Sequence, residues 1–530
     1  MAVTQRKEDN IQRATIIVMI TLLLSRILGF VREVIVANVY GASIETDAFF
    51  AAFTIPDVMF NLLIAGALSS GFMPVFTSYI AKGEDEKAWK SANSFITAAL
   101  IFILIFNVLG ITFAKILVPL VASGMMKTPE GFELTVKLTR IMFTAVTFTV
   151  LAGLLRGILN SYKVFTAPAI GPVLYNVGMI GGALILGATS LGIFGMTIGV
   201  IVGALMNFLV QVPDFRRVGG AKYLKFTIDT KDEGFRKMIA LMIPAIIGLS
   251  VSQLNIVINQ NIATFLGEGY LTLVRYANRV MLLPLGIFAM AIATTLFPVM
   301  NTQIARKEIN EFKDTFSEGF RTIMYITIPA AVGMIVLNQE VIRLLFKSGS
   351  FTESDVHITG IVLAFYSFGL IGQSAVQIIT RGFYAIQDTK TPVKVAFITV
   401  IVNGVLGVGL TFFTPLGIAG VSCAYSVSSI VNMYLLYKGL RKKTKGLKTK
   451  EIANSCAKAS VASFIMGGVV LIISRIGESL LGIETKTDQI ISVGLAMGIG
   501  IPLYFYITYK FKMSEMDFFI AKVKRKIKRK

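Results

Sequence analysis

The chain has 530 residues, of which 55% are hydrophobic and 15% are charged, and its mean hydropathy is +0.73. Such a composition argues against a water-soluble globular protein and places the chain in a lipid bilayer. The formal net charge of +21 would suit a nucleic-acid-binding protein, but the basic residues follow a pattern along the chain that favours membrane orientation instead.

Fourteen apolar runs follow one another along the chain, and each can cross a hydrocarbon core about 30 Å thick as a helix. The runs lie at residues 14–40, 46–72, 92–122, 133–160, 168–189, 191–212, 236–264, 270–300, 320–339, 356–385, 391–413, 416–437, 454–474 and 487–509. The first run contains no small-residue cleavage site, so we expect it to stay as a helix and not to be removed as a signal peptide. The predicted fold class is an all-α polytopic membrane protein with 14 transmembrane helices.

Basic residues occur in every second connection between these runs. They begin with Arg6, Lys7 and Arg13, recur after every even-numbered run, and end in the tail 522–530. The opposite connections are short, neutral or acidic, as in the stretch 478–488. Because Lys and Arg concentrate in cytoplasmic loops, both termini are predicted to be cytoplasmic. Contacts with anionic membrane lipids account for these charges, and no nucleic-acid partner is expected.

An internal repeat indicates two related lobes. The stretch "FMPVFTSYIAKGEDE" at 72–86 resembles "LFPVMNTQIARKEIN" at 296–310, an offset of 224 residues, and "LGIFG" at 191–195 resembles "LGIAG" at 416–420. An offset of six runs is even, so both copies have the same orientation in the membrane.

This repeat predicts the domain organisation. Two six-helix lobes, residues 1–217 and 218–440, should be related by a pseudo-two-fold axis along the membrane normal. The remainder, 441–530, should hold two extra helices and the basic cytoplasmic tail. A central cavity between the lobes is expected.

The first run carries three full charges, Arg26, Arg32 and Glu33. At 1.5 Å per residue, Arg26 lies about 18 Å along this run, close to the middle of the bilayer. Inserting an Arg there costs roughly 2.5–3.5 kcal/mol, so a partner or water must relieve it. Together with Ser25 and Gly29, these charges suggest a helix face turned toward an aqueous cavity.

Other charges lie in the second, eighth and tenth runs. Arg279 is deep in the eighth run, shortly before Pro284, which can bend the helix. Asp47 and Asp57 lie in the second run, and Asp388 follows the tenth run near the cytoplasmic surface. Since the deep Arg residues outnumber the deep acids, we expect a positively charged cavity, and guanidinium groups match phosphate oxygens. Alternatively, these charges pair internally and only hold the helices together.

Chemistry other than transport has little support in the sequence. Cys423 and Cys456 do not have metal-ligand spacing, His357 is the single histidine, and no GxxxxGK[ST] phosphate loop is present. We therefore expect no metal site, no cofactor and no enzymatic activity. A polytopic enzyme would need a catalytic cluster in a long outer loop.

Three stretches carry a resemblance to a known family. They are "SRILGFVREVIVANVYGASIETDAFFAAFTIPD" (25–57), "YANRVMLLPLGIFAMAIATTLFPV" (276–299) and "RGFYAIQDTKTPVKVA" (381–396). They closely resemble the MurJ (MviN) family of lipid II flippases, in the MOP superfamily of multidrug, oligosaccharidyl-lipid and polysaccharide exporters. By motif the resemblance covers about residues 14–440, although the fold alone would be shared with other exporters.

The resemblance implies a flippase for lipid II, the undecaprenyl-diphosphate-linked peptidoglycan precursor, which would move from the cytoplasmic to the outer leaflet by alternating access. The membrane potential or a coupled Na⁺ or H⁺ would drive transport. The implied setting is the bacterial cytoplasmic membrane, where a monomer would serve cell-wall biogenesis and cell shape beside the cell-wall synthesis machinery. The last two helices would form a groove for the polyprenyl tail.

The family's functional residues fall on Arg26, Arg32 and Arg279 here, and Asp47 also matches. The full set of substrate-binding candidates is Ser25, Arg26, Arg32, Glu33, Asp47 and Arg279, and the candidates for ion binding or gating are Asp57, Asn259 and Asp388. Two departures concern charge. Phe60 and Asn61 stand where many relatives have basic residues, and Asn259 and Leu282 stand where relatives carry acids, so a sodium site in the second lobe is not assured.

Two other substrates remain open at this point. A related exporter would move another polyprenyl-diphosphate oligosaccharide, and a cation-coupled exporter would move drugs. A cavity for cationic drugs should present acids, so the excess of Arg disfavours the second alternative.

Overall fold

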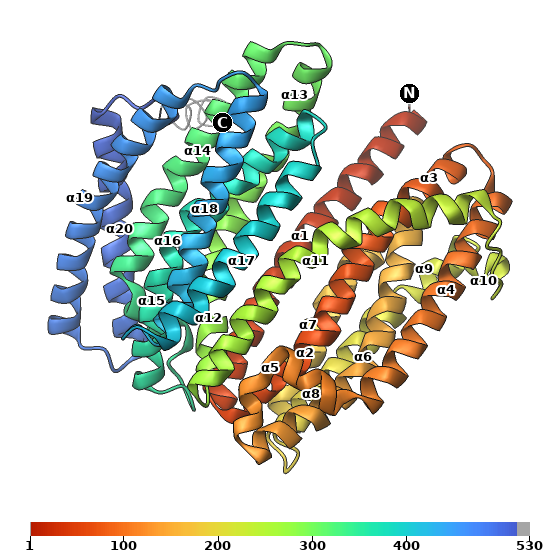
Figure 1. Cartoon of the computed structure of the whole chain (residues 1–530), viewed down its shortest axis with the longest axis horizontal. Helices are drawn as coiled ribbons and strands as arrows, with labels where there is room; N and C mark the ends of the chain where they lie inside the picture. Colours follow the sequence, from red (N-terminus) through yellow and green to blue (C-terminus); the bar gives the residue numbers. More distant parts are fainter. Residues whose placement is uncertain (1, 517–530) are drawn as a thin grey trace. The chain divides into compact units, whose positions relative to one another are not determined.

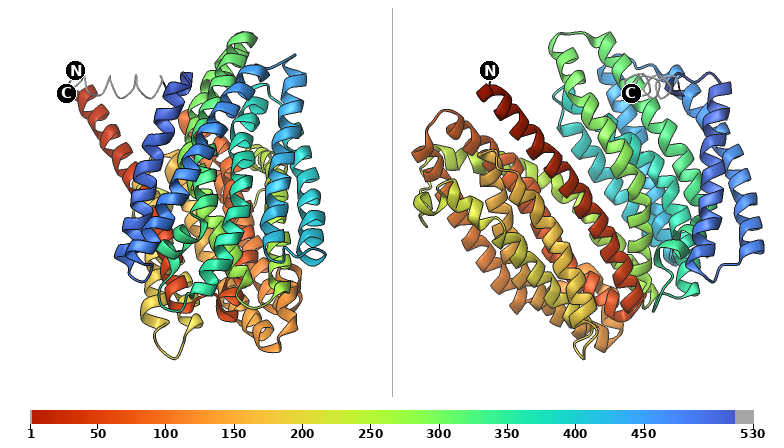
Figure 2. Two further views of the ribbon diagram at one scale, coloured as in Figure 1. Left: turned by 90° about the vertical axis from the view of Figure 1, so that its left-hand side faces the viewer. Right: turned by 180° about the vertical axis from the view of Figure 1, so that it is seen from behind.

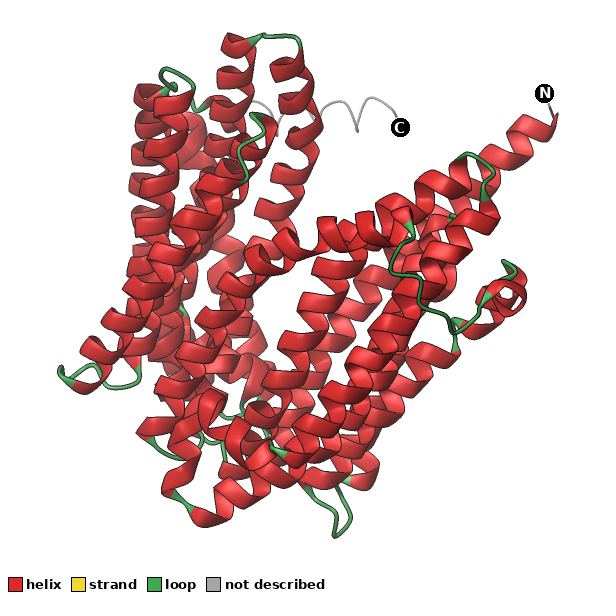
Figure 3. Ribbon diagram, turned by 45° about the vertical axis from the view of Figure 1, so that its right-hand side comes forward, coloured by secondary structure: helices red, strands yellow, loops and turns green. Residues whose placement is uncertain are grey.

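The computed structural model describes the backbone of residues 2–516, and the side chains from residue 18 onward apart from those of residues 65, 67 and 481. Every regular element in this part of the chain is a helix, and the helices are joined mostly by short loops (Figure 3). The predicted basic tail 522–530 lies outside the described residues, as do the side chains of Arg6, Lys7 and Arg13.

Thirteen helices within the described residues are long and apolar enough to cross a membrane. They are Ile44–Ala81, Asp85–Thr112, Pro129–Ser161, Thr166–Leu186, Ile193–Arg217, Glu233–Leu266, Tyr270–Ala305, Ile309–Val336, Glu353–Ala385, Lys390–Phe412, Ala419–Lys443, Thr449–Leu480 and Lys486–Lys510. The first predicted span is covered by one further long helix, α1 (Ala2–Tyr40), which holds the three charges at residues 26, 32 and 33. The predicted all-α polytopic fold is confirmed.

The chain packs into two compact units. The first comprises Met1–Thr272 with Ser348–Phe351, and the second comprises Leu273–Lys347 with Thr352–Lys530. The lobe boundaries predicted after residues 217 and 440 follow an internal repeat and not packing density, so they stay a prediction.

The first unit contains the helices from α1 to α11 and the first residues of α12. Its elements after α1 are α2 (Ile44–Asn61), η1 (Leu62–Phe72), α3 (Met73–Ala81), α4 (Asp85–Thr112), α5 (Ala114–Ala122), η2 (Ser123–Lys127), α6 (Pro129–Ser161), α7 (Thr166–Gly181), η3 (Gly182–Leu186), α8 (Ile193–Leu209), α9 (Val212–Arg217), α10 (Gly220–Tyr223) and α11 (Glu233–Leu266). The run predicted as one span at 92–122 is two helices, α4 and α5, separated at Phe113.

Within the first unit α1 packs against α7, α7 against α8, α8 against α6, and α6 against α2. Figures 1 and 2 show α1 as one long helix from the N-terminus. An aromatic core containing Phe72, Phe76 and Trp89 is fully buried. The contact between α1 and α7 fixes the face of α1 that carries Arg32.

The second unit contains the remaining helices. They are α12 (Tyr270–Pro284), η4 (Leu285–Ala289), α13 (Met290–Ala305), α14 (Ile309–Val336), α15 (Asn338–Phe346), α16 (Glu353–Ala385), α17 (Lys390–Phe412), α18 (Ala419–Lys443), α19 (Thr449–Leu481) and α20 (Lys486–Lys510). Helix α16 packs against α14 and α18, and α19 packs against α14 and α20. The last two helices lie side by side as a hairpin (Figures 1 and 2).

Proline positions explain one irregular stretch. Pro284 ends α12 and is followed directly by the π-helical turn η4. Proline removes a backbone donor and clashes with the preceding turn, and single π-helical turns inside long helices often occur at functional sites. The helix is therefore irregular at the point where Pro284 is predicted to bend it, five residues after Arg279.

Candidate functional site

Helix α1 presents Ser25, Gly29 and Arg32 on one face, because these residues are four and three positions apart. This face packs against α7. A Cβ at Gly29 would lie 3.7 Å from Oδ1 of Asn176, so the two helices approach closely there. The face predicted to turn toward an aqueous cavity therefore meets the polar side chain of Asn176.

The Arg32 guanidinium is held by three groups. Nη2 donates to Oε1 of Glu33 at 2.5 Å, and Nη1 donates to Oδ1 of Asn176 at 3.2 Å and to the sulfur of Met179 at 3.4 Å. Glu33 is buried, with 3% of its surface exposed. Charge-assisted hydrogen bonds of this kind are about twice as strong as neutral ones, so Arg32 has a fixed orientation.

Asn176 connects this guanidinium to the backbone of α1. Its Nδ2 donates to the carbonyl oxygen of Ser25 at 3.3 Å and to that of Pro172 at 2.9 Å. Asp57 and Tyr175 also interact electrostatically with Arg32. Two carboxylates thus act on this one Arg, and the positively charged cavity stays a prediction.

Arg26 has a different environment. Its side chain is exposed, and among the described residues it makes no hydrogen bond and no ion pair. The two Arg residues on α1 therefore differ, since Arg32 is held by protein groups whereas Arg26 keeps its donors available.

Asp47 is almost completely buried, with 1% of its surface exposed, and accepts three hydrogen bonds. Its Oδ2 accepts from the N–H of Gly269 at 2.8 Å, and its Oδ1 accepts from the N–H and the hydroxyl of Thr272 at 2.8 and 2.6 Å. These donors lie at the start of α12, where backbone N–H groups have no partner within the helix. A carboxylate there is also favoured by the helix dipole. Asp47 therefore caps α12 from another helix.

The end of α1 meets the same part of the first unit. Ser350 donates from its N–H to the carbonyl oxygen of Asn38 at 2.8 Å, and its hydroxyl donates to that of Val39 at 3.1 Å. Gly269 has φ +80°, and a Cβ there would lie 2.5 Å from the carbonyl oxygen of Ala42. The stretch 38–47 thus contacts two segments that are distant in sequence, 269–272 and 348–351.

Arg279 lies in the second unit, on α12, and its side chain is exposed. The predicted convergence of Arg279 with Arg26 and Arg32 on one cavity stays a prediction. Asn259 is half-buried on α11 in the first unit. Among the described residues no three His, Cys, Asp or Glu side chains gather in a way that could hold a metal ion.

Asp388 forms a local structure at the start of α17. Its carboxylate accepts from the N–H of Lys390 at 3.1 Å, from the N–H of Thr391 at 3.0 Å and from the Thr391 hydroxyl at 2.5 Å, and it pairs with Lys443. Burial alone would raise the pKa of Asp388, but these hydrogen bonds and the Lys443 charge lower it to about 2. The carboxylate stays ionised and joins α17 to the end of α18.

Several residues of this site were not among those predicted from the sequence. Asn176 is a polar residue inside an apolar run, and that was a usable signal. Thr272 and Gly269 carried no signal of their own, because the carboxylate they bind is more than two hundred residues away in sequence.

Comparisons with known proteins agree with this fold. The family model "Lipid II flippase MurJ" matches residues 36–485. The "Lipid II flippase MurJ" of Burkholderia cenocepacia is 35% identical over 439 residues, which cover 82% of this chain and 84% of that protein. The "Probable lipid II flippase MurJ" of Vibrio cholerae is 33% identical over 467 residues, covering 87% of this chain and 88% of the relative.

Solved structures give the same result. A structure described as "Lipid II flippase MurJ, inward closed conformation" superimposes with a TM-score of 0.78 at 28% identity, covering 94% of this chain and 98% of the other. An inward-facing multidrug resistance MATE family transporter of the MOP superfamily matches with a TM-score of 0.67 at 14% identity, over 81% of this chain and 98% of its own. The second likeness concerns the fold alone. The chain belongs to the MurJ family of lipid II flippases and is a multi-pass membrane protein.

Proposed function

We propose that this protein moves lipid II from the cytoplasmic to the outer leaflet of the bacterial cytoplasmic membrane by alternating access. Family membership, the names of the relatives and the fold support this proposal. Loop charge supports the orientation, with both termini in the cytoplasm. The proposed driving force is the membrane potential or a coupled Na⁺ or H⁺, because the sequence contains no Walker-type phosphate loop.

The observation that carries the proposal is the contrast between the two Arg residues of α1. Arg32 is oriented by Glu33 and Asn176, whereas Arg26 is exposed and makes no hydrogen bond or ion pair among the described residues. An Arg guanidinium binds phosphate oxygens through two parallel hydrogen bonds. Arg26 would thus meet the diphosphate first, and Arg32 would exchange Glu33 for a phosphate oxygen.

The contacts around Asp47 would form the outer closure in this scheme. The loop-charge pattern puts the end of α1 and the start of α12 on the outer side, where Asp47 holds Gly269 and Thr272. Release of the lipid outside would require these hydrogen bonds to break. They would re-form when the empty transporter returns.

Complementation tests the proposal. In a bacterium whose own lipid II flippase is depleted, this chain should restore growth, and Arg26→Ala, Arg32→Ala and Arg279→Ala should each fail to do so. Arg217→Ala is the matched control, because Arg217 is exposed and, among the residues described, pairs only with Asp214 three residues away. Equal membrane levels of each variant must be checked by immunoblot. Full growth with all three cavity variants would contradict the mechanism.

Substrate selectivity needs a separate measurement. Native mass spectrometry of the purified protein should show binding of lipid II in preference to a polyprenyl diphosphate that carries another oligosaccharide, and no binding of a lipophilic cationic drug. Arg26→Ala should weaken lipid II binding. Equal binding of both lipid-linked sugars would mean that the protein recognises the diphosphate but not the sugar, and that its substrate range is broader than lipid II.

A further inference from the structure

The hairpin formed by α19 and α20 is attached to the second unit by close helix packing. A Cβ at Gly467 on α19 would lie 2.7 Å from Cγ1 of Val332 on α14, and a Cβ at Gly500 on α20 would lie 2.4 Å from Cγ2 of Val470 on α19. Small residues let membrane helices approach closely where lipid offers no hydrophobic driving force. The middle of the hairpin therefore packs tightly through small residues.

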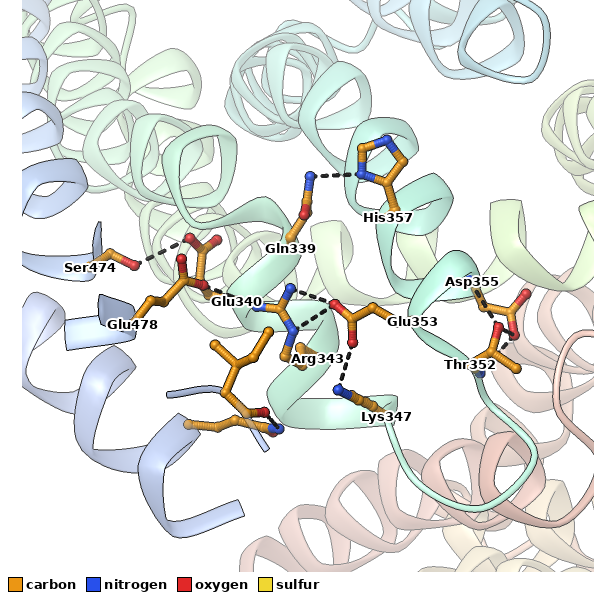
Figure 4. Close-up of polar contacts among 12 residues, drawn as sticks. Gln339, Glu340, Arg343, Lys347, Thr352, Glu353, Asp355, His357, Ser474 and Glu478 are labelled. Carbon is orange, nitrogen blue, oxygen red and sulfur yellow. Dashed lines mark hydrogen bonds and ion pairs between the residues drawn. The ribbon is translucent and has the colours of Figure 1, made fainter. Parts of the chain in front are cut away.

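Directional contacts occur at one end of the hairpin, around Arg343 of the short helix α15 (Figure 4). Only 6% of the Arg343 surface is exposed. Its Nε and Nη2 donate to Oε1 of Glu353, at 2.9 and 2.5 Å, and its Nη1 donates to Oε1 of Glu478 at 3.1 Å. One guanidinium thus joins the start of α16 to the last turns of α19.

Two further contacts reinforce this end. Ser474 of α19 donates to Oε1 of the buried Glu340 at 3.2 Å. Lys486, the first residue of α20, donates to the carbonyl oxygens of Arg343 and Leu344 at 3.1 and 3.0 Å. Those carbonyls belong to the last turn of α15, where a cation satisfies unpaired acceptors and the helix dipole. We call Glu340, Arg343, Glu353, Ser474, Glu478 and Lys486 the outer clamp.

The opposite end of the hairpin is attached to α14. Ser455 of α19 donates to Oε1 of Glu515 at 2.9 Å, and Arg321 of α14 lies 3.5 Å from the same oxygen. Tyr504 of α20 donates its hydroxyl to the carbonyl oxygen of Tyr325 at 2.7 Å. Both ends of the hairpin are therefore held by buried polar contacts to helices of one unit.

Burial decides how strongly the outer clamp depends on Arg343. Breaking a buried ion pair by removing one partner leaves an uncompensated charge, whereas removing both charges is often nearly neutral. Glu353 is half exposed and also pairs with Lys347 at 2.7 Å, so it tolerates the loss of Arg343. Without Arg343, Glu478 would keep only the exposed Arg475 as an ion-pair partner among the described residues. The connection between α15 and α19 thus depends on Arg343.

We propose that Arg343 is a positioning residue that locks the α19–α20 hairpin to α15 and α16, so that the hairpin and the rest of the second unit move as one rigid body. The locking itself is independent of substrate. Its consequence for transport rests on the proposed function, because a fixed hairpin would keep the wall of the polyprenyl groove in place while the headgroup crosses.

Spin-label distances test the locking without substrate. Ser354→Cys on α16 and Ser479→Cys on α19 are exposed sites outside the clamp, and they would be labelled in a background with Cys423 and Cys456 replaced. In proteoliposomes the native clamp should give one narrow distance distribution, and Arg343→Met should abolish the narrow peak. Arg475→Met, an exposed neighbour that also contacts Glu478, should keep it.

A double variant guards against misfolding. Arg343→Met with Glu478→Gln removes the Glu478 charge together with its buried partner, while Glu353 keeps Lys347 and Glu340 keeps the Ser474 hydroxyl. The protein should therefore fold, yet the distance distribution should remain broad because the connection through Arg343 is gone. A narrow peak in this folded double variant would overturn the proposal. So would a broad distribution in the protein with its native clamp.

Cross-linking tests the consequence for transport. The exposed Lys486 of α20 contacts the half-buried Leu344 of α15, so cysteines at these two positions can be joined by a short thiol-reactive linker. Lipid II transport should be unchanged by the linker if the hairpin never separates from α15. A loss of transport that a cleavable linker restores on cleavage would refute rigid-body motion. If the chain moved no lipid II at all, the proposed function would fail while the distance measurements still decided the locking.

Discussion

Replacing Asp47 by Asn should destabilise the first unit strongly. The carboxylate accepts two N–H groups and one hydroxyl in a buried site. An Asn side chain offers one oxygen, so it can serve Thr272, but its NH₂ group then faces the N–H of Gly269 and leaves that donor unsatisfied. A buried unsatisfied donor costs about 1–3 kcal/mol, and the two remaining hydrogen bonds lose roughly half their strength when the charge is removed. We expect a total of about 3–5 kcal/mol.

A smaller change at the same site provides a reference for the expected loss of stability. Thr272→Val removes only the hydroxyl donor and leaves Asp47 with both N–H groups, so it should cost about 1.5 kcal/mol. For a unit of this size, 1 kcal/mol corresponds to roughly 2 °C in Tm. Asp47→Asn should therefore lower Tm by about 6–10 °C and Thr272→Val by about 3 °C.

The assay is thermal unfolding of the purified protein in one detergent, followed by intrinsic fluorescence. Ser252→Ala is the control, because the Ser252 side chain is exposed and, within the described part of the chain, its hydroxyl bonds only to the Leu249 carbonyl of its own helix. It should shift Tm by no more than about 1 °C, as for ordinary surface substitutions. The reasoning is refuted if Asp47→Asn unfolds at the wild-type temperature or if Thr272→Val is the more damaging change.

Three other outcomes are expected. Asn176→Leu should reduce lipid II transport about tenfold while the protein still folds, because Arg32 loses a hydrogen bond worth about 1.4 kcal/mol to its orientation; wild-type transport rates in proteoliposomes would contradict this. Asp388 has its pKa lowered from 3.8 to about 2 in the folded protein, so its stabilising contribution is present above pH 3.8 and is lost as the pH falls toward 2; Tm of Asp388→Asn should be less pH-dependent than that of the wild type across this range. Gly269→Ala should lower Tm far more than Gly83→Ala, since both glycines have positive φ but a Cβ at residue 83 meets no atom within 4 Å, and equal shifts would show that the contact with Ala42 is not tight.

The fold was readable from the sequence because a bilayer imposes a simple rule. A helix must bury its backbone polar groups in apolar surroundings for about 20 residues, and thirteen of the fourteen predicted runs coincide with helices that meet this rule. The first run is also helical, in α1. The prediction that was wrong concerns a local helix break. The break at Phe113 between α4 and α5 does not interrupt the apolar run, because the residues on both sides of it are apolar.

The site could be predicted only in part, because the sequence shows how deep a residue lies in the membrane but not which residues of other helices it contacts. The sequence predicted that Ser25, Gly29 and the charges of α1 turn toward an aqueous cavity, whereas Ser25, Gly29 and Arg32 lie against Asn176 of α7. It could not show that Asn176 would stand opposite, since that contact joins residues 144 positions apart. Arg343 was missed for another reason. It lies in a nine-residue helix between two spans, where a basic residue passes for an ordinary loop charge.

The different environments of Arg26 and Arg32 limit which anions could bind to both residues. A ligand that met both residues equally would gain little from Arg32, because removing that guanidinium from Glu33 and Asn176 costs hydrogen bonds that the ligand has to replace. An anion with a single charge could not compensate for both. A diphosphate carries two charged groups, so one can bind the exposed Arg26 while the other displaces Glu33 from Arg32. In this proposal Glu33 would select against weaker anions, and Glu33→Gln should widen the range of bound phosphate esters while lipid II binding is retained. Loss of lipid II binding in that variant would make Glu33 a structural partner of Arg32 and not a selective one.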